Sequence, residues 1–140
     1  MGERVAVGPI TYNVFEASWK NELAGNDGHR TPMNRYLVLR LSVTNGGNND
    51  FSLPLLRLEG SDGKIYIEEQ SGEGVESWLG LIRVISANQT TDGRILFDVP
   101  PGTYRLQVVD NGDLEDQKAR YVEIPFTVEP TVKVPVPGEQ

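Results

Sequence analysis

Short segments of alternating hydrophobic and polar residues recur along the chain, separated by turn-forming residues. The clearest segment spans residues 36–44, where positions 37, 39, 41 and 43 are Leu or Val and Val38 is the apolar exception on the opposite side. Alternation with a period of two is typical of a half-buried β-strand, whereas a helix would spread these residues around its circumference. We therefore expect a strand whose odd-numbered side chains face the core.

The same alternation predicts eight or nine strands in all. Clear segments follow at 95–99, 104–108 and 122–128, and less regular ones at 4–7, 10–15, 53–59, 64–67 and 81–85. Pro125 cannot donate a ladder hydrogen bond, so segment 122–128 is expected to be an edge strand or to carry a bulge. The leucines of 53–59 change sides, which predicts a bulge near 54–56. Helical potential is limited to one turn at 73–79.

Turn signals divide these segments at regular intervals. Asx-Gly pairs occur at 27–28, 45–46, 62–63, 92–93 and 111–112, and Pro100-Pro101-Gly102 adds another break. Such pairs tolerate the positive φ of tight hairpin turns. Short strands joined by tight turns predict an all-β protein with an immunoglobulin-like antiparallel β-sandwich. We expect one domain over 1–130, with long connections at 17–35 and 70–88, and a Pro-containing tail at 131–140.

Tyr104 opens a predicted strand directly after Thr103, behind the proline-rich break. This position is typical of the tyrosine corner of β-sandwich domains, in which the phenol donates a hydrogen bond to a nearby backbone carbonyl. We therefore expect a structural role for Tyr104.

Composition restricts the possible functions of this 140-residue chain. Its formal charge of −7 argues against nucleic-acid binding, which requires a basic surface. The chain has no cysteine, which excludes disulfides, thiolate metal sites and a cysteine nucleophile. Its single histidine, His29, falls in a polar loop and has no orienting partner in any motif.

No motif of an enzyme is present. Serines lack a Gly-x-Ser-x-Gly frame, and no glycine-rich phosphate loop follows a strand. Glu68 and Glu69 are neighbours on a predicted strand, so they point to opposite faces and cannot act as a carboxylate pair. We expect no catalytic residues, no cofactor and no enzyme activity.

An acidic cluster offers one candidate interaction patch. Residues 59–76 contain six acidic side chains and one lysine, a local charge of −5. The patch would attract a cationic partner or grip a basic peptide or a sugar beside an indole, and it comprises Glu68, Glu69, Glu73, Glu76 and Trp78. The alternatives are a solvated rim that keeps the protein soluble and a tryptophan that packs in the core.

Two further groups of residues are candidate binding sites. Asp110, Asp113, Glu115 and Asp116 form an oxygen-rich loop that suits calcium, although it misses the EF-hand register, and a simple turn explains it without any ion. Trp19, Tyr12 and Tyr36 would make a carbohydrate platform if exposed, or would pack inside the protein.

Three strand segments carry a resemblance to a known family. They read GPITYNV at 8–14, YLVLRLSVTN at 36–45 and GRILFDVP at 93–100. The chain is similar to a bacterial family of immunoglobulin-like domains that are exported or lipid-anchored and known as a domain of unknown function. The mycobacterial immunoprotective extracellular antigens share that sandwich. The resemblance implies a fold and no catalytic residues.

From this resemblance we expect a non-catalytic, exported or cell-envelope domain that mediates protein interaction or contributes to envelope structure, with a protein or an envelope component as its partner. A small-ligand or carbohydrate-binding module, with or without calcium, is the alternative. The chain shows no transmembrane run and no export signal before its first strand, so a cytoplasmic location is the alternative to the envelope. An edge strand near Pro125, or the 132–136 tail, offers a route to a homodimer.

Overall fold

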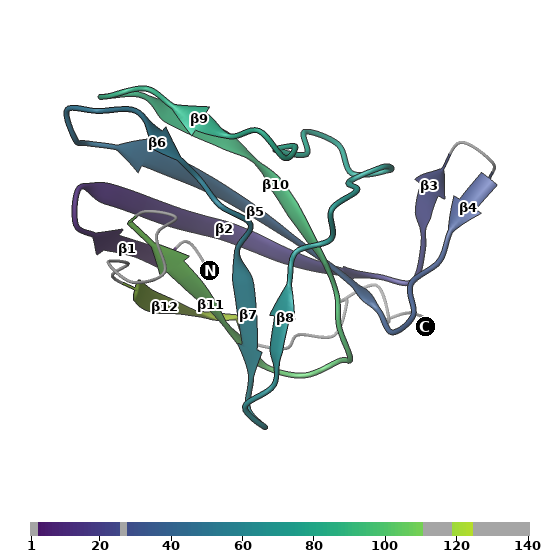
Figure 1. Cartoon of the computed structure of the whole chain (residues 1–140). Coiled ribbons are helices and arrows are strands. Elements are labelled where there is room, and N and C mark those ends of the chain that lie inside the picture. The colour runs from purple at the N-terminus through teal and green to yellow at the C-terminus, as the bar shows by residue number, and fades with distance from the viewer. Residues whose placement is uncertain (1–2, 26–27, 111–118, 125–140) are drawn as a thin grey trace, which may run out of the picture.

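Two antiparallel β-sheets pack face to face in the computed structural model, which describes residues 3–25, 28–110 and 119–124 (Figure 1). The first sheet has the order β1-β2-β5-β10 and comprises β1 (Glu3–Val7), β2 (Ile10–Lys20), β5 (Tyr36–Asn45) and β10 (Thr90–Asp98). The second has the order β12-β11-β7-β8 and comprises β12 (Ala119–Ile124), β11 (Tyr104–Val109), β7 (Arg57–Gly60) and β8 (Ile65–Ile67). Two small two-stranded sheets pair β3 (Leu23–Gly25) with β4 (Gly28–Arg30), and β6 (Phe51–Ser52) with β9 (Val84–Ile85).

This architecture confirms the predicted all-β sandwich. Each of the nine predicted segments contains a strand, and β3 and β4 add a hairpin inside the predicted connection 17–35. Segment 53–59 holds no bulged strand: only its end belongs to a strand, β7, because residues 53–56 carry the chain from β6, which pairs with β9, to β7, which pairs with β11. The described residues contain no helix, so 73–79 forms turns and no described helix could span a membrane. The predicted tail 131–140 and Pro125 lie outside the described residues.

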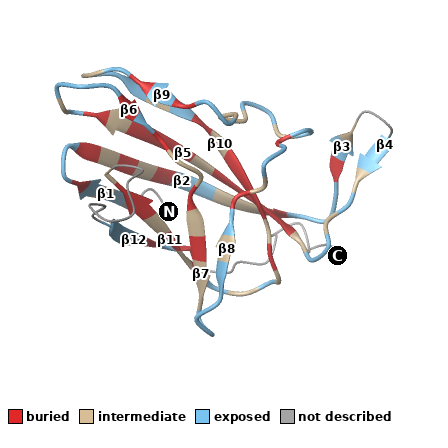
Figure 2. Cartoon of the chain, in the orientation of Figure 1, coloured by how far each residue is buried: buried red, intermediate tan, exposed pale blue. Residues whose placement is uncertain are grey.

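The core lies between the two sheets and follows the predicted alternation (Figure 2). On β5 the side chains of Leu37, Leu39, Leu41 and Val43 are fully buried between the sheets. Tyr12 on β2 is also fully buried, and its hydroxyl donates a 2.5 Å hydrogen bond to the carbonyl of Val109 at the end of β11. This bond links one sheet to the other across the core.

A β-bulge in β2 changes which side chains face the core. The register with β5 shifts between Val14 and Glu16. Before the bulge Tyr12 and Val14 point inward, and after it Trp19 does, because one extra residue reverses the alternation. The bulge therefore turns Glu16, together with Ser18 and Lys20, to the outer face of the first sheet.

The tyrosine corner is present as predicted. The Tyr104 hydroxyl donates a hydrogen bond to the carbonyl of Pro100, four residues earlier. Its ring packs 6.3 Å from that of Trp19 and edge-on to Tyr66 at 5.9 Å between centroids. Burial raises the pKa of Tyr104 to about 12, and the nearby Tyr66 and Asp62 add to the shift. The phenol therefore stays protonated and able to donate over the whole neutral range.

Replacing Tyr104 with Phe removes one hydrogen bond and keeps the ring. We expect the free energy of unfolding at pH 7 to fall by about 1 kcal/mol, the usual value for one such bond. Chemical denaturation of both proteins measures the change. An unaltered midpoint and slope would show that the corner contributes nothing.

The same pair of proteins gives a pH prediction. A phenol whose pKa is about 12 when folded and about 10 when unfolded stabilises the folded state below pH 10, and this stabilisation is lost as the pH rises through 12. The stability difference between wild type and Tyr104→Phe should therefore shrink above pH 10. A difference that stays constant up to pH 11 would contradict the assignment.

Candidate functional site

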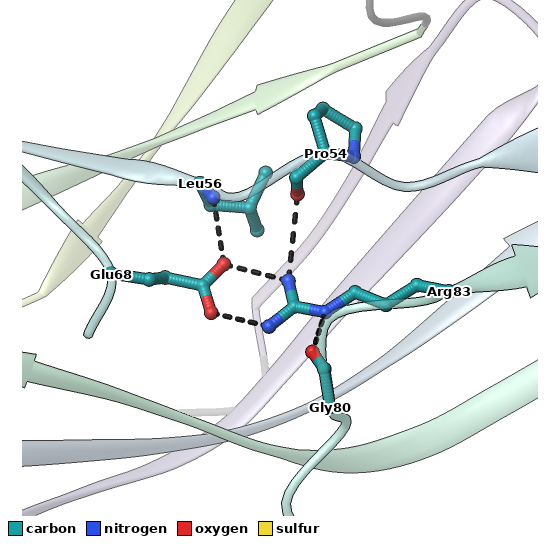
Figure 3. Close-up of polar contacts among 5 residues, drawn as sticks. All are labelled: Pro54, Leu56, Glu68, Gly80 and Arg83. Atoms are coloured by element: carbon teal, nitrogen blue, oxygen red, sulfur yellow. Dashed lines mark hydrogen bonds and ion pairs between the residues drawn. The ribbon is translucent and has the colours of Figure 1, made fainter. Parts of the chain in front are cut away.

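A buried ion pair fixes the two ends of the long connection between β8 and β9 (Figure 3). Glu68 follows β8 and Arg83 precedes β9, and both side chains are almost fully enclosed. The two guanidinium amines of Arg83 meet the two carboxylate oxygens at 2.6 and 2.8 Å. The Leu56 amide donates to the carboxylate at 2.7 Å, and the Arg83 Nε donates to the carbonyl of Gly80 at 2.6 Å. Both charges are therefore paired and hydrogen-bonded, as burial requires.

From this anchor the chain crosses to the free edge of β10. The Glu69 amide donates to the carbonyl of Leu96 at 2.8 Å. Further along, the Leu79 amide donates to the Arg94 carbonyl and the Arg94 amide to the Ser77 carbonyl, at 3.0 and 2.9 Å. A parallel bridge thus joins residue 78 to β10. The connection is held against the first sheet at both its start and its end.

Two glycines allow this close approach. A Cβ on Gly93 in β10 would lie 2.5 Å from the Leu79 side chain and 2.8 Å from the Ser77 carbonyl. A Cβ on Gly72 would lie 2.0 Å from the indole of Trp78. The prediction of a turn at 92–93 was therefore wrong, because Gly93 makes room for a crossing chain inside a strand.

A second apolar cluster lies on the outer face of the first sheet, beneath this connection. Leu23, Tyr36, Val38 and Leu96 are buried there, and Val75 from the connection packs against them. The cluster explains why β5 and β10 carry apolar side chains on both faces. Val38, the exception in the predicted alternation, is the residue that this cluster covers.

A groove of about 340 Å³ opens beside the second cluster. Ligand sites in proteins begin at about 300 Å³. Its walls and floor come from β2, β3, β5, β10 and the connection, and its lining residues are Glu16, Ser18, Lys20, Leu23, Val38, Gly74, Val75, Glu76 and Arg94. Two carboxylates and two cationic side chains thus surround an apolar floor. Arg94 also donates to the Glu76 carbonyl at 3.1 Å, which ties β10 to the opposite wall.

The five residues of the predicted interaction patch do not form one exposed surface. Glu68 is buried against Arg83, which excludes it from any surface contact. Trp78 is half-buried, with its ring against Gly72. Of the remaining three residues, Glu76 alone lines the groove. The sequence gives an acidic run, but the fold turns one of its members inward because alternate residues point to opposite sides.

The Arg30 side chain lies between Glu69 and Glu73, the other two acidic residues of the predicted patch. Its guanidinium lies 3.8 Å from the Glu69 carboxylate and donates to the Glu73 carbonyl at 2.7 Å, while its plane covers the Tyr36 ring at 5.4 Å. Part of the predicted negative charge is thereby balanced by a residue of β4.

The histidine and the calcium candidates of the sequence analysis do not join the groove. The His29 ring is 72% exposed in the β3–β4 hairpin and lies 3.4 Å from the Glu22 carboxylate. Of the calcium candidates, Asp110 lies against Gly8, whereas Asp113, Glu115 and Asp116 lie outside the described residues. The described ranges hold no group of three His, Cys, Asp or Glu side chains that could bind a metal ion.

The aromatic platform was a wrong alternative. Tyr12 and Trp19 are buried in the main core, and Tyr36 is buried in the second cluster. No two of these rings therefore present a face to a sugar.

Sequence reasoning missed Arg83 and the basic wall of the groove. Arg83 shares the inward parity of Ile85 within segment 81–85, and a charged residue at an inward position signals a buried partner. Lys20 and Arg94 carried no such signal, because their placement depends on the bulge in β2 and on the crossing connection.

The chain resembles known sequences and structures over the whole sandwich. Residues 1–125 match the sequence profile of DUF4352, a domain of unknown function. YjhA from Bacillus subtilis is 13% identical with a TM-score of 0.65, over 89% of this chain and 97% of YjhA. A β-sandwich protein from Clostridium difficile is 12% identical with a TM-score of 0.50, over 86% of this chain and 90% of its own.

One similar structure is larger. YcdA from Bacillus subtilis, a candidate lipoprotein, is 15% identical with a TM-score of 0.68, over 92% of this chain and 40% of YcdA. Similarity at these identities shows a shared fold. No curated protein matches the chain.

Breaking the buried ion pair should destabilise the protein strongly. We expect Glu68→Leu or Arg83→Met alone to lower the free energy of unfolding by about 3–5 kcal/mol, because each leaves a buried charged partner unpaired. The double variant Glu68→Leu/Arg83→Met should lose much less than the sum of the single changes. Denaturant titration of the three variants measures this coupling.

Arg105→Met provides the matched control. Its partner pair with Glu59 lies on the outer face of the second sheet, where the Arg105 side chain is 44% exposed. Loss of an exposed pair costs about 0–1 kcal/mol. Equal losses at Arg83 and Arg105 would contradict a special role for the buried pair.

Proposed function

The chain belongs to the DUF4352 family, and from that premise we propose that it is a non-catalytic binding domain of the bacterial cell envelope. We further propose that it binds an extended polypeptide segment of a partner protein. The groove between β2 and the β8–β9 connection carries this proposal.

The composition of the groove favours a polypeptide. Its charges are balanced, with Glu16 and Glu76 against Lys20 and Arg94, and its floor is formed by apolar side chains such as Val38. A peptide offers charges of both signs, backbone polar groups and apolar side chains within a short length. A nucleic acid would meet carboxylates here, and net binding of phosphates requires an excess of cations.

The groove is also held in shape before any ligand enters. Its outer wall is fixed by the Glu68–Arg83 pair at one end and by the hydrogen bonds between Arg94 and residues 77–79 at the other. A preformed site loses less conformational entropy on binding. This rigidity supports a role of the groove in ligand recognition.

Binding is favoured over the two other classes of function. A sugar site commonly offers an aromatic face, and Tyr12, Trp19 and Tyr36 are buried. Catalysis would need an activated nucleophile, and Ser18 in the groove would have to use the chain's one imidazole, which lies in the β3–β4 hairpin beside Glu22. These observations support a non-catalytic role.

The envelope location draws support from the relatives. YcdA, which shares this fold, is a candidate lipoprotein.

A peptide-display selection followed by calorimetry of purified peptides tests the groove. We expect peptides to be recovered, and we expect Ser18→Trp, which fills the groove, to raise their Kd at least about tenfold. Lys20→Glu should weaken acidic peptides and leave neutral ones nearly unchanged. Ser52→Trp on β6 is the matched control, because Ser52 is exposed and does not line the groove.

Two outcomes would overturn this assignment. One is peptide binding that Ser18→Trp leaves unaltered, since the groove would then not be the site. The other is a glycan array with strong binding beside a peptide selection that yields nothing.

Cell fractionation of the native host tests the location separately. We expect an antibody against the domain to detect it in the membrane or extracellular fraction, with a cytoplasmic enzyme as the control for lysis. A protein found with that enzyme in the cytoplasm would contradict the envelope proposal and leave the peptide experiment standing.

A further inference from the structure

The strand β8 ends the second sheet and leaves backbone groups without partners. Its ladder with β7 is set by the Gly60 amide, which donates to Lys64, and by the Glu68 amide, which donates to Leu56. In an antiparallel pair, alternate residues direct their backbone N–H and C=O to opposite sides. Ile65 and Ile67 therefore direct theirs away from β7, and the described residues offer them no partner.

Each of the other edges of the two main sheets is covered. Residues 77–79 hydrogen-bond to the edge of β10. The two edges at the opposite side, β1 and β12, lie against each other and close the sandwich. Exposed edges are commonly blocked in this way because they pair with other chains. Within the described residues, the edge of β8 is left open.

The side chains of this edge are apolar as well as accessible. Ile65 and Ile67 are 53% and 54% exposed on the outer face of the second sheet. They flank Tyr66, whose ring turns inward to Tyr104. A three-residue strand thus presents four unpaired backbone groups at its free edge and two isoleucines on the adjoining outer face.

We propose that β8 pairs with β8 of a second copy of this chain, around a two-fold axis through Tyr66. That register places Ile65 opposite Ile67 of the other copy, and Ile67 opposite its Ile65. All four outward backbone groups of each strand then find partners, and the four isoleucines form one cross-strand cluster. Directly opposed side chains stabilise a pair of strands. The two second sheets become one continuous sheet of eight strands.

The charge at the start of β8 also favours the antiparallel arrangement. Lys64 precedes the strand and is exposed. An antiparallel two-fold pairing brings the start of one strand to the end of the other and keeps the two lysines apart, whereas a parallel pairing in register would place them directly opposite each other.

Sedimentation velocity of the full 140-residue chain tests the proposal, from about 10 µM to about 1 mM, the range of a weak dimer. We expect a concentration-dependent dimer in the wild type. Ile65→Lys should raise the dimer Kd at least about tenfold. Ile67→Pro should do the same, because it removes an outward N–H and leaves the bonds to β7 intact.

Ile82→Lys is the matched control, since Ile82 is 90% exposed and lies outside β8. It should dimerise as the wild type does, and circular dichroism should show that all variants are folded. A wild type that stays monomeric at the highest concentration would overturn the proposal. So would a dimer that Ile65→Lys and Ile67→Pro leave unaltered.

A cysteine experiment tests the register. The chain has no cysteine, and residue 66 would face its own copy at a non-hydrogen-bonded position, where Cα atoms lie about 4.5 Å apart. Such a distance permits a disulfide. We expect Tyr66→Cys to cross-link rapidly under mild oxidation and Ile82→Cys to remain monomeric; equal rates would contradict the two-fold pairing.

Discussion

The buried ion pair of Glu68 and Arg83 is the interaction on which both the groove and the open edge of β8 depend. It joins two points of the chain fifteen residues apart and fixes both ends of the connection that crosses the first sheet. Because the carboxylate points inward at position 68, its neighbour Ile67 must point outward. One contact therefore sets both the wall of the groove and the apolar edge of β8.

A charged pair is a costly way to hold a loop, because both ions lose their hydration. An apolar pair could give similar stability without fixing a direction. The fork of Arg83 instead meets both oxygens of Glu68, and its remaining donors reach the carbonyls of Gly80 and Pro54. This geometry admits one arrangement of the connection. We therefore attribute the pair to specificity of structure.

Local patterns predicted most of the sandwich, and contacts between distant segments account for what they missed. Alternation located β5, and the proline-rich break located the corner at Tyr104. The inward position of Trp19 could not be read from alternation, because the bulge before it reverses the two faces. Gly93 resembled a turn residue, yet it makes space for a segment fifteen residues earlier in the chain. The groove follows from such non-local contacts, so its basic residues carried no signal.

The groove and the open edge belong to opposite sheets, and this separation has a consequence for binding. The groove lies on the outer face of the β1-β2-β5-β10 sheet, whereas β8 ends the other sheet, and their residues do not overlap. Pairing through β8 would use none of the residues that line the groove. Two linked sites on a partner held at a surface bind more tightly than one, because the second contact forms at a high effective concentration. Weak self-association is therefore sufficient to increase the apparent affinity of a groove that binds its ligand weakly, and neither the dimer contact nor the groove needs high affinity alone.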